Sequence, residues 1–435
     1  MSIEDPRLSS IDNTSAADDF DSAVEQHLGY ASETVGGIEV AQAETPDATR
    51  TDRLPAQTPP GEVAAATIPT EVKPNEQNVV TLPAGIELDN LEFEVEGDNL
   101  VLVLADGTEI VAAASAKGVM VAFEAAVAGG IPIIKALREG LTANSIQWIA
   151  GIINGTTNFI LSEMRDKGLD FAVVLKEAQR LGYAETDPTF DIEGVDAAHK
   201  VTLMSAIAFG IPVQFDKAYV EGITQLGATD IKYAEQLGYR IKLLGITKRT
   251  AQGIELRVHP SLVPAKRLIA NVEGAMNAVV VQGDAVGTTL YYGKGAGSEP
   301  TASAVIADLV DITRLHTADP LHRVPHLAFQ PNSMSDVAVL PMSEVVTSYY
   351  LRLRVADEAG VLAQVTGLLA TAGISIDAVL QREADEVSGE GGTSTDLIIL
   401  THNTREGTMT DALAQLQQLP TVLAPIVRIR KEELN

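Results

Sequence analysis

The chain has 435 residues, a formal net charge of −28 and no cysteine. Its length is enough for about three domains, and its acidic balance argues against nucleic acid and anionic membranes as partners. The absence of cysteine excludes disulfides and thiolate metal sites. No apolar run has the length of a membrane span without a charge or a breaker, and the first residues lack the order of a secretory signal, so we expect a cytoplasmic protein.

The acidic charge is concentrated at the N-terminal end, where residues 1–112 carry 23 Asp and Glu against four Lys and Arg. Residues 1–76 are rich in Ala, Asp, Glu, Thr and Pro and contain few large apolar residues, a composition that predicts disorder. Residues 77–112 alternate apolar and acidic positions and contain the turn sequences EGDN and ADG. This second pattern predicts a small unit of three or four short antiparallel strands.

Residues 181–200 collect five carboxylates within twelve positions and then end on a single lysine. Pro188 and Gly194 keep the first part out of a helix, whereas the apolar spacing that follows predicts a helix entering a core. On that helix Asp196 and Lys200 are four positions apart and therefore share a face. A lysine beside carboxylates at the mouth of a buried helix can be held ready to donate a proton. A surface helix start with an ordinary salt bridge is the alternative.

Four long strings carry a family resemblance: FEAAVAGGIPII, NGTTNFIL, GYAETDPTFDIEGVDAAHK and YYGKGAGSEPTASAV. With them the chain resembles homoserine dehydrogenases from about Ala116 to its C-terminus. That family interconverts homoserine and aspartate 4-semialdehyde with NAD or NADP, in threonine, methionine and isoleucine biosynthesis. The resemblance implies an α/β to α+β chain, with a remnant of the dinucleotide-binding fold at 113–140 and a mixed-sheet catalytic and dimerisation domain at 141–320.

After a polar linker at 321–347, residues 348–430 read as strand, helix, strand, strand, helix, strand. With DEAGVLAQVTGLLATAGISI this segment resembles an ACT domain, a ferredoxin-like βαββαβ fold that commonly binds an amino acid. The resemblance implies threonine as an effector and a homodimer or homotetramer as the assembly. An ACT-like domain used only for oligomerisation is the alternative. The implied effector site comprises Asp357, Gly360 and Ile374.

The resemblance also implies the roles of the residues at the substrate site. Reducing an aldehyde by hydride transfer leaves an alkoxide that must receive a proton, so a general acid has to lie beside the carbonyl oxygen. Lys200 corresponds to that proton donor, and Asp196 would position the reacting hydroxyl or the lysine. The ammonium of the substrate needs a carboxylate, which Glu185 and the nearby Asp191 would supply. The other substrate-binding positions are Asn154, Thr156 and Tyr183.

Two further sets of residues correspond to binding positions of the family. Those that lie against the cofactor, NADP or NAD, are Gly182, Gly295 and Gly297. The monovalent cation site, usually a sodium site, corresponds to Glu124, Val127, Gly129 and Ile131. One carboxylate with backbone carbonyls around a Gly-Gly turn suits a hard, weakly held ion. A helix-entry turn with one solvated glutamate is the alternative.

Residues 1–115 contain no GxGxxG fingerprint after a strand, the sequence that holds the pyrophosphate in a dinucleotide-binding half. They also contain no counterpart of the family's second active-site lysine, because Lys73 lies in a loop-like acidic context. The first hypothesis is a homoserine dehydrogenase-type oxidoreductase, which Lys200 and the glycines favour. The absent fingerprint favours the alternatives, which are a non-catalytic amino-acid-sensing or regulatory subunit and an inactive gene fusion.

Overall fold

The computed structural model divides the chain into two compact units, Met1–Leu88 and Asp89–Asn435. In the first unit it describes two short strands that pair in parallel, β1 (Glu39–Ala41) and β2 (Val79–Thr81). This parallel pair differs from the purely antiparallel pairing that we expected for β2. The rest of the predicted disordered segment lies outside the described residues. From Asp89 onward the described residues are 92–96, 99–103, 119–318, 322–330, 333–383, 387 and 393–434.

The second unit contains a short hairpin and one large mixed sheet. In the hairpin, β3 (Glu92–Glu96) pairs antiparallel with β4 (Asn99–Val103). The main path of the large sheet runs β10-β9-β5-β7-β8-β15-β11-β13-β12, with β6 on β8 and β14 on β11. In chain order its strands are β5 (Ile146–Ile152), β6 (Tyr219–Val220), β7 (Tyr239–Arg249), β8 (Ile254–Pro264), β9 (Met276–Gly283), β10 (Gly287–Lys294), β11 (Val346–Ala356), β12 (Ile376–Gln381), β13 (Ser394–Thr401), β14 (Thr404–Arg405) and β15 (Val427–Lys431).

The helices lie in several of the connections between these strands, and none of those described is long and apolar enough to cross a membrane. The α-helices are α2 (Ile133–Lys135), α3 (Gly155–Lys167), α4 (Phe171–Arg180), α5 (Thr189–Ile192), α6 (Val195–Phe209), α7 (Ala228–Gln236), α8 (Ser298–Leu315), α9 (Val361–Thr371) and α11 (Glu406–Leu416). The 3-10 and π-helical turns are η2 (Glu124–Ala126), η3 (Ala136–Gly140), η4 (Phe215–Lys217), η5 (Leu268–Asn271) and η8 (Met342–Glu344).

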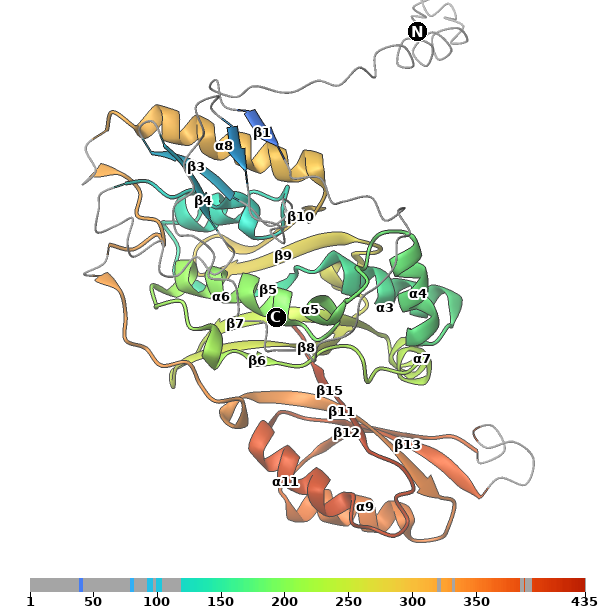
Figure 1. Cartoon of the computed structure of the whole chain (residues 1–435). Helices are drawn as coiled ribbons and strands as arrows, with labels where there is room; N and C mark the ends of the chain where they lie inside the picture. The colour runs from blue at the N-terminus through green and yellow to red at the C-terminus, as the bar shows by residue number, and fades with distance from the viewer. Residues whose placement is uncertain are drawn as a thin grey trace, which may run out of the picture. The chain divides into compact units, whose positions relative to one another are not determined.

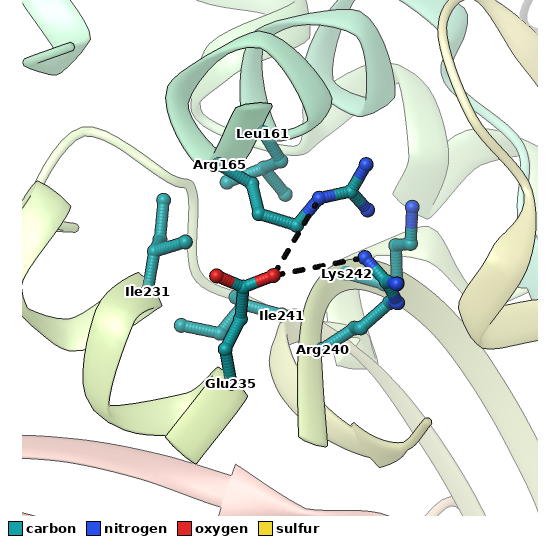
Figure 2. Close-up of a pocket in the computed structure, with 7 residues that line it drawn as sticks. All are labelled: Leu161, Arg165, Ile231, Glu235, Arg240, Ile241 and Lys242. Atoms are coloured by element: carbon teal, nitrogen blue, oxygen red, sulfur yellow. Dashed lines mark ion pairs between the residues drawn. The ribbon is translucent and has the colours of Figure 1, made fainter. Parts of the chain in front are cut away.

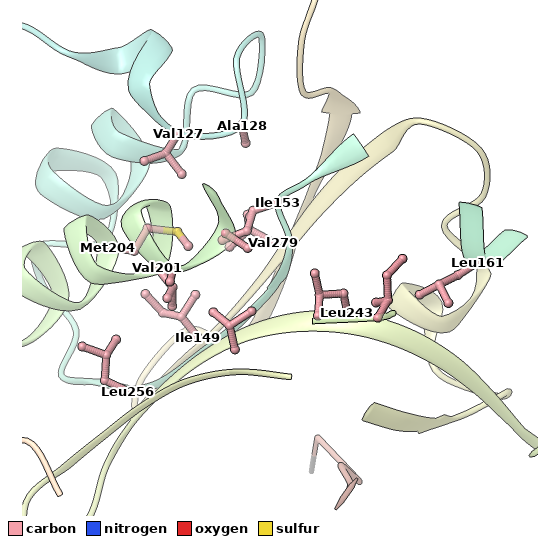
Figure 3. Packing of buried hydrophobic residues seen from close by; sticks show 14 of the residues in the cluster. Val127, Ala128, Ile149, Ile153, Leu161, Val201, Met204, Leu243, Leu256 and Val279 are labelled. Atoms are coloured by element: carbon pink, nitrogen blue, oxygen red, sulfur yellow. The ribbon is translucent and has the colours of Figure 1, made fainter. Parts of the chain in front are cut away.

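The main hydrophobic core lies between helix α6 and the sheet (Figure 3). Val201 and Met204 of α6 are fully buried and face alternate residues of the strands, among them Ile149 of β5 and Val279 of β9. This arrangement follows from the alternation of side chains along a strand, which sends every second residue to the helix-covered face. The same packing fixes α6, and with it the acidic end of α6, relative to the end of β5.

The C-terminal segment continues the same sheet rather than forming a separate one. Strand β15 pairs in parallel with β8 through Arg430 and Lys431, and β11, β13 and β12 follow in the ferredoxin-like order. Helices α9 and α11 lie together on one face of these strands (Figure 1). The ACT fold expected from the sequence is therefore present, and it is joined to the catalytic sheet by strand pairing.

The sequence predicts a short buried strand at VMVAFEAA and no helix before Gly194 in the acidic stretch, and both predictions were wrong. Residues 119–123 form no strand among the described residues, although VMVAFEAA has the composition of one. A strand needs a paired neighbour to satisfy its backbone, and no described strand pairs with this segment. The acidic stretch also contains the short helix α5, which begins directly after Pro188, because proline is tolerated at a helix start. Gly194, with a φ of 83°, separates α5 from α6.

Candidate active site

The site is centred on Asn154, which follows β5 and caps the N-terminus of α3. Its Oδ1 accepts hydrogen bonds from the backbone N–H and the hydroxyl of Thr157, each at 2.9 Å. Because these donors fix the amide oxygen, the amide nitrogen must point the other way. Nδ2 donates to Asp191 Oδ1 at 2.6 Å and to Asp196 Oδ2 at 2.9 Å. One buried amide therefore holds two carboxylates that are distant from it in sequence.

Lys200 completes this group from helix α6. Its Nζ donates to Asp196 Oδ2 at 2.8 Å and to the carbonyl oxygen of Ile153 at 3.2 Å. The side chains of Lys200 and Asp196 are 22% and 19% exposed, so both are reachable yet mostly withdrawn from water. The shared helix face predicted from their spacing is confirmed as a direct ion pair. The amine of Lys200 is thus held beside two carboxylates at the end of β5.

Burial of Asp191 raises the pKa of its carboxyl group above the usual range. The neighbouring charge of Asp196 adds to this rise, whereas the hydrogen bond from Asn154 opposes it. The carboxylates of Asp191 and Asp196 repel each other, so the space between them favours a cation. Lys200 supplies one positive charge, and a second ammonium group would be attracted to the same place.

The loop between α4 and α5 brings the other predicted substrate residues near α3. The hydroxyl of Thr156 donates to the carbonyl oxygen of Tyr183 at 2.6 Å, which ties the loop to the first turn of α3. The ring of Tyr183 packs on Phe159, with 4.5 Å between the ring centroids. Gly182 has a φ of 77°, and Glu185 is exposed at the outer part of the loop. The structure therefore groups Asn154, Thr156, Asp191, Asp196 and Lys200, and it leaves Glu185 at the edge.

The predicted cofactor loop and the predicted cation turn are in direct backbone contact. The backbone N–H of Gly130 donates to the carbonyl oxygen of Lys294 at 3.1 Å. A Cβ added to Gly129 would lie 2.5 Å from the carbonyl oxygen of Gly295, and one added to Gly295 would lie 1.9 Å from Asn277 Nδ2. Both glycines are therefore required by close approach. Gly297, with a φ of 114°, follows in the same loop and precedes α8.

Asn277 was missed by the sequence reasoning. It lies on β9 at 1% exposure, and its Oδ1 has no hydrogen-bond partner among the described residues. A buried amide oxygen without a donor is unusual and calls for an explanation. The only signal in the sequence was a polar residue inside the apolar run MNAVVV, which a strand core also tolerates. Its place beside Gly295 depends on the pairing of β9 with β10, which no local pattern reveals.

Glu124 is buried at 5% exposure, and both of its carboxylate oxygens bind the start of α2. Oε1 accepts from the N–H of Ile134 and Oε2 from that of Lys135, each at 2.8 Å. Burial raises the pKa of Glu124 to about 7, and the charge of Asp308 contributes to the rise. No ion pair within the described part of the chain neutralises Glu124. The glutamate of this helix-entry turn is therefore buried rather than solvated, and it caps the start of α2.

The predicted effector residues occupy the turn between β11 and α9 and the segment between α9 and β12. Asp357 and Gly360 are exposed, and Gly360 has a φ of 93° at the N-cap of α9. Ile374 is 4% exposed and belongs to the core under α9 and α11. The structure thus separates two exposed turn residues from one core residue.

Comparisons with known proteins agree with this fold. Residues 132–310 match the family model described as homoserine dehydrogenase, and residues 349–421 match the ACT domain. A homoserine dehydrogenase of Pseudomonas aeruginosa is 60% identical over 337 residues, which are 78% of this chain and 77% of the relative. One of Neisseria gonorrhoeae is 59% identical, with 78% of this chain and 76% of the relative covered.

Solved structures show the same relationship. The crystal structure of a homoserine dehydrogenase from Thiobacillus denitrificans matches with a TM-score of 0.72 and 67% identity, covering 76% of this chain and 74% of that one. One from S. aureus matches with a TM-score of 0.56 and 30% identity, covering 76% and 73%. The family consists of NAD(P)-dependent oxidoreductases of amino-acid biosynthesis. None of these findings favours the regulatory-subunit or fusion alternatives. The chain belongs to the homoserine dehydrogenase family and carries a C-terminal ACT domain.

Proposed function

We propose that the group around Asn154 is the substrate site of this homoserine dehydrogenase. The single observation that supports it most is the amide of Asn154, which donates to both Asp191 and Asp196 while Lys200 donates to Asp196. A lysine held by a carboxylate can pass a proton to or from the reacting oxygen of the substrate. Asp196 orients that lysine, and the hydroxyl of Thr156 lies on the adjacent turn. These roles are the ones that the sequence resemblance implies.

The ammonium group of homoserine needs a partly buried negative charge. Asp191 suits this role because Asn154 holds it beside Asp196, and Glu185 adds a second carboxylate from the exposed loop. An ammonium bound there would offset the burial of Asp191 and its repulsion by Asp196, which together raise the pKa of Asp191. Tyr183 would cover the substrate from the loop tied to Thr156.

The residues present fit the nicotinamide end of a dinucleotide. Gly295 and Gly297 lie in a partly exposed loop, and Gly295 closely approaches the buried amide of Asn277, whose oxygen has no hydrogen-bond partner among the described residues. Gly182 would lie on the substrate side. When bound, the nicotinamide ring supplies or accepts the hydride. The loop would hold the ring, and the residues around Lys200 would bind, orient and protonate the substrate. The choice between NADP and NAD belongs to the half of the site that binds the adenosine.

Two further ligands belong to this proposal. A monovalent cation such as sodium would bind at Glu124 with carbonyl oxygens of Val127, Gly129 and Ile131, where it would neutralise the buried carboxylate. Threonine would bind at the ACT turn of Asp357 and Gly360, in a homodimer or homotetramer.

The proposed roles are tested by steady-state kinetics of homoserine oxidation with single variants. We expect Lys200→Ala to lower kcat by about a hundredfold or more, because general acid–base catalysis contributes about that much. We expect Glu185→Gln mainly to raise KM, because Glu185 would contact only the ammonium. Lys232→Ala, which removes an exposed lysine on α7, is the control. A Lys200→Ala enzyme with the kcat of the control would contradict the proposal.

A further inference from the structure

Lys242 on β7 is a buried lysine that the reaction itself does not use. Its side chain is 2% exposed, and it lines a pocket together with charged residues of three elements (Figure 2). In the close-up, Glu235 of α7 lies between Arg165 of α3 and Arg240 of β7, with Lys242 behind Arg240. A lysine in such a place needs specific acceptors for its amine hydrogens.

The acceptors of Lys242 are a side chain of α3 and the segment before β9. Its Nζ donates to Asn158 Oδ1 at 3.1 Å and to the carbonyl oxygen of Val272 at 2.5 Å. The amide nitrogen of Asn158 donates in turn to the carbonyl oxygens of Val272 and Gly274, at 3.1 and 2.8 Å. Asn158 is 1% exposed, so Lys242 satisfies an oxygen that water cannot reach.

The hydrogen bonds that join Lys242, Asn158 and Val272, here called the clasp, hold the first turn of α3. Asn158 lies one turn after Asn154, and its backbone N–H donates to the carbonyl oxygen of Asn154 at 3.4 Å. The clasped segment also touches the helix start directly, because a Cβ added to Gly155 would lie 2.8 Å from the carbonyl oxygen of Ala275. The position of the Asn154 amide therefore depends on contacts that Lys242 completes.

We propose that Lys242 is a positioning residue for the dehydrogenase reaction. Through Asn158 it holds the first turn of α3 where Asn154 can orient Asp191 and Asp196. The inference rests on the proposed function, because it matters for turnover only if these carboxylates serve the substrate. A small displacement of catalytic groups lowers the rate strongly even when the fold is kept.

The charge of Lys242 supports a role in positioning rather than in stability. Burial lowers the pKa of Lys242 to about 8, and the charge of Glu273 opposes this shift. Arg165 and Arg240 lower the pKa further, and Asp166 raises it slightly. From α7, Glu235 also faces the cluster.

A folded-state pKa below the ordinary value means that the protonated amine weakens the fold at neutral pH. The fold regains that stability as pH rises from about 8 toward the usual lysine pKa. The neutral amine keeps two hydrogens for Asn158 and Val272, so we expect the clasp to persist above pH 8. The orientation of Asn158 is then what the amine supplies.

The test compares Lys242→Met with Lys242→Gln and with the control Lys248→Met, in the full chain. Lys248 lies on the same strand but is exposed. Hydrogen exchange of α3, read by mass spectrometry, reports the helix start without requiring turnover. In Lys242→Met we expect exchange at residues 158–162 to rise about tenfold, and kcat to fall about tenfold with a smaller change in KM. Lys242→Gln, whose amide can still donate, should recover part of both.

Unchanged α3 exchange and unchanged kcat in Lys242→Met would overturn the inference. If the wild-type chain shows no turnover, the proposed function fails, and the exchange comparison still decides whether Lys242 holds the helix start. If Lys242→Met does not fold, Asn158→Leu opens the same clasp from the other side. Asn158→Leu should then show the same faster exchange at the start of α3, and exchange equal to the control would overturn the inference.

Discussion

At the scale of single residues, Asn154 decides the geometry of the site. Its oxygen is committed to the cap of α3, so its two amide hydrogens are available to Asp191 and Asp196. Each hydrogen bond to a charged acceptor contributes more than a neutral one, about 1.5–3 kcal/mol. The amide thus keeps two like charges near each other and leaves Lys200 as their positive partner.

The buried Glu124 predicts a pH dependence of stability. Burial raises the folded-state pKa of Glu124 to about 7, above the ordinary glutamate value of 4.5. The stability that comes from its protonated form is therefore fully present below about pH 4.5 and is lost as pH rises through 7. Glu124→Gln has no such titration. In sodium-free buffer we expect wild type to lose about 3 kcal/mol of unfolding free energy relative to this variant between pH 5 and 8.

Urea unfolding at a series of pH values measures this difference, and Glu299→Gln, at an exposed position on α8, serves as the control. Parallel pH profiles of stability for wild type and Glu124→Gln would contradict the raised pKa of Glu124. Sodium should restore part of the loss in wild type but not in the variant, because a bound cation would offset the buried charge.

Some of these residues could be predicted from sequence and others could not. The spacing of Asp196 and Lys200 on one helix face is local, so the pattern alone indicated that they share a face. Lys242 acts through Asn158, which is more than 80 positions away in the sequence. Asn277 acts across the pairing of two strands. Such contacts follow from tertiary packing, which no local spacing encodes.

At the scale of elements, the site depends on two loops that approach each other by their backbones. The turn at Gly129 and the loop at Gly295 leave no room for a Cβ on either glycine. This contact sets the distance between the start of α2 and the start of α8. It explains why residues that the sequence placed in two different binding sites lie together.

Replacing Gly295 tests this contact. A methyl group there would lie 1.9 Å from Asn277 Nδ2, so the strand or the loop must shift. Overpacking of this kind costs about 1–3 kcal/mol, and we expect Gly295→Ala to lower the unfolding free energy by that amount. Gly140→Ala, where a Cβ meets nothing within 4 Å, is the matched control. Equal thermal midpoints for the two variants would show that the loop adapts without strain.

Secondary structure could be predicted where the local pattern was strong, and it could not be predicted where strand formation depended on pairing with a distant segment. Helix α6 spans Val195–Phe209, within the apolar stretch after Gly194 where the spacing predicts a helix. The segment 119–123 has strand composition but no described partner, so composition alone misassigned it. The pairing of β15 with β8 joins segments about 170 positions apart, and no turn signal marks it.

At the scale of the second unit, the ACT fold and the catalytic sheet are joined by buried charges. Successive residues of β11 face opposite ways: Leu351 packs under α9 and α11, whereas Arg352 turns to α7. There Arg352 binds both oxygens of Asp230 at 2.6 and 2.9 Å, and the hydroxyl of Tyr350 donates to Asp230 at 3.0 Å. Asp230 is fully buried, so this ion pair holds β11 of the ACT fold to α7 of the catalytic part.

Removing one partner of that ion pair should be strongly destabilising. In Arg352→Met the carboxylate of the buried Asp230 keeps, among the described residues, only the hydroxyl of Tyr350 as a partner. An uncompensated buried charge costs about 3–5 kcal/mol. Denaturant unfolding should show that loss, and adding Asp230→Asn should recover most of it. Arg314→Met removes a side chain that is 72% exposed and is the control. A loss of unfolding free energy no larger than that of the control would mean that water reaches the Arg352–Asp230 ion pair.

The most direct test of the account is homoserine oxidation by the full chain, measured with NADP and with NAD. Calorimetric titration with the reduced cofactor accompanies it, and a thermal unfolding transition shows that the chain is folded. We expect saturable cofactor binding and homoserine-dependent reduction of the oxidised cofactor that disappears in Lys200→Ala. A folded chain that neither binds cofactor at millimolar concentration nor oxidises homoserine would contradict the proposed function. A dissociation constant of about 1 mM corresponds to only about 4 kcal/mol of binding free energy.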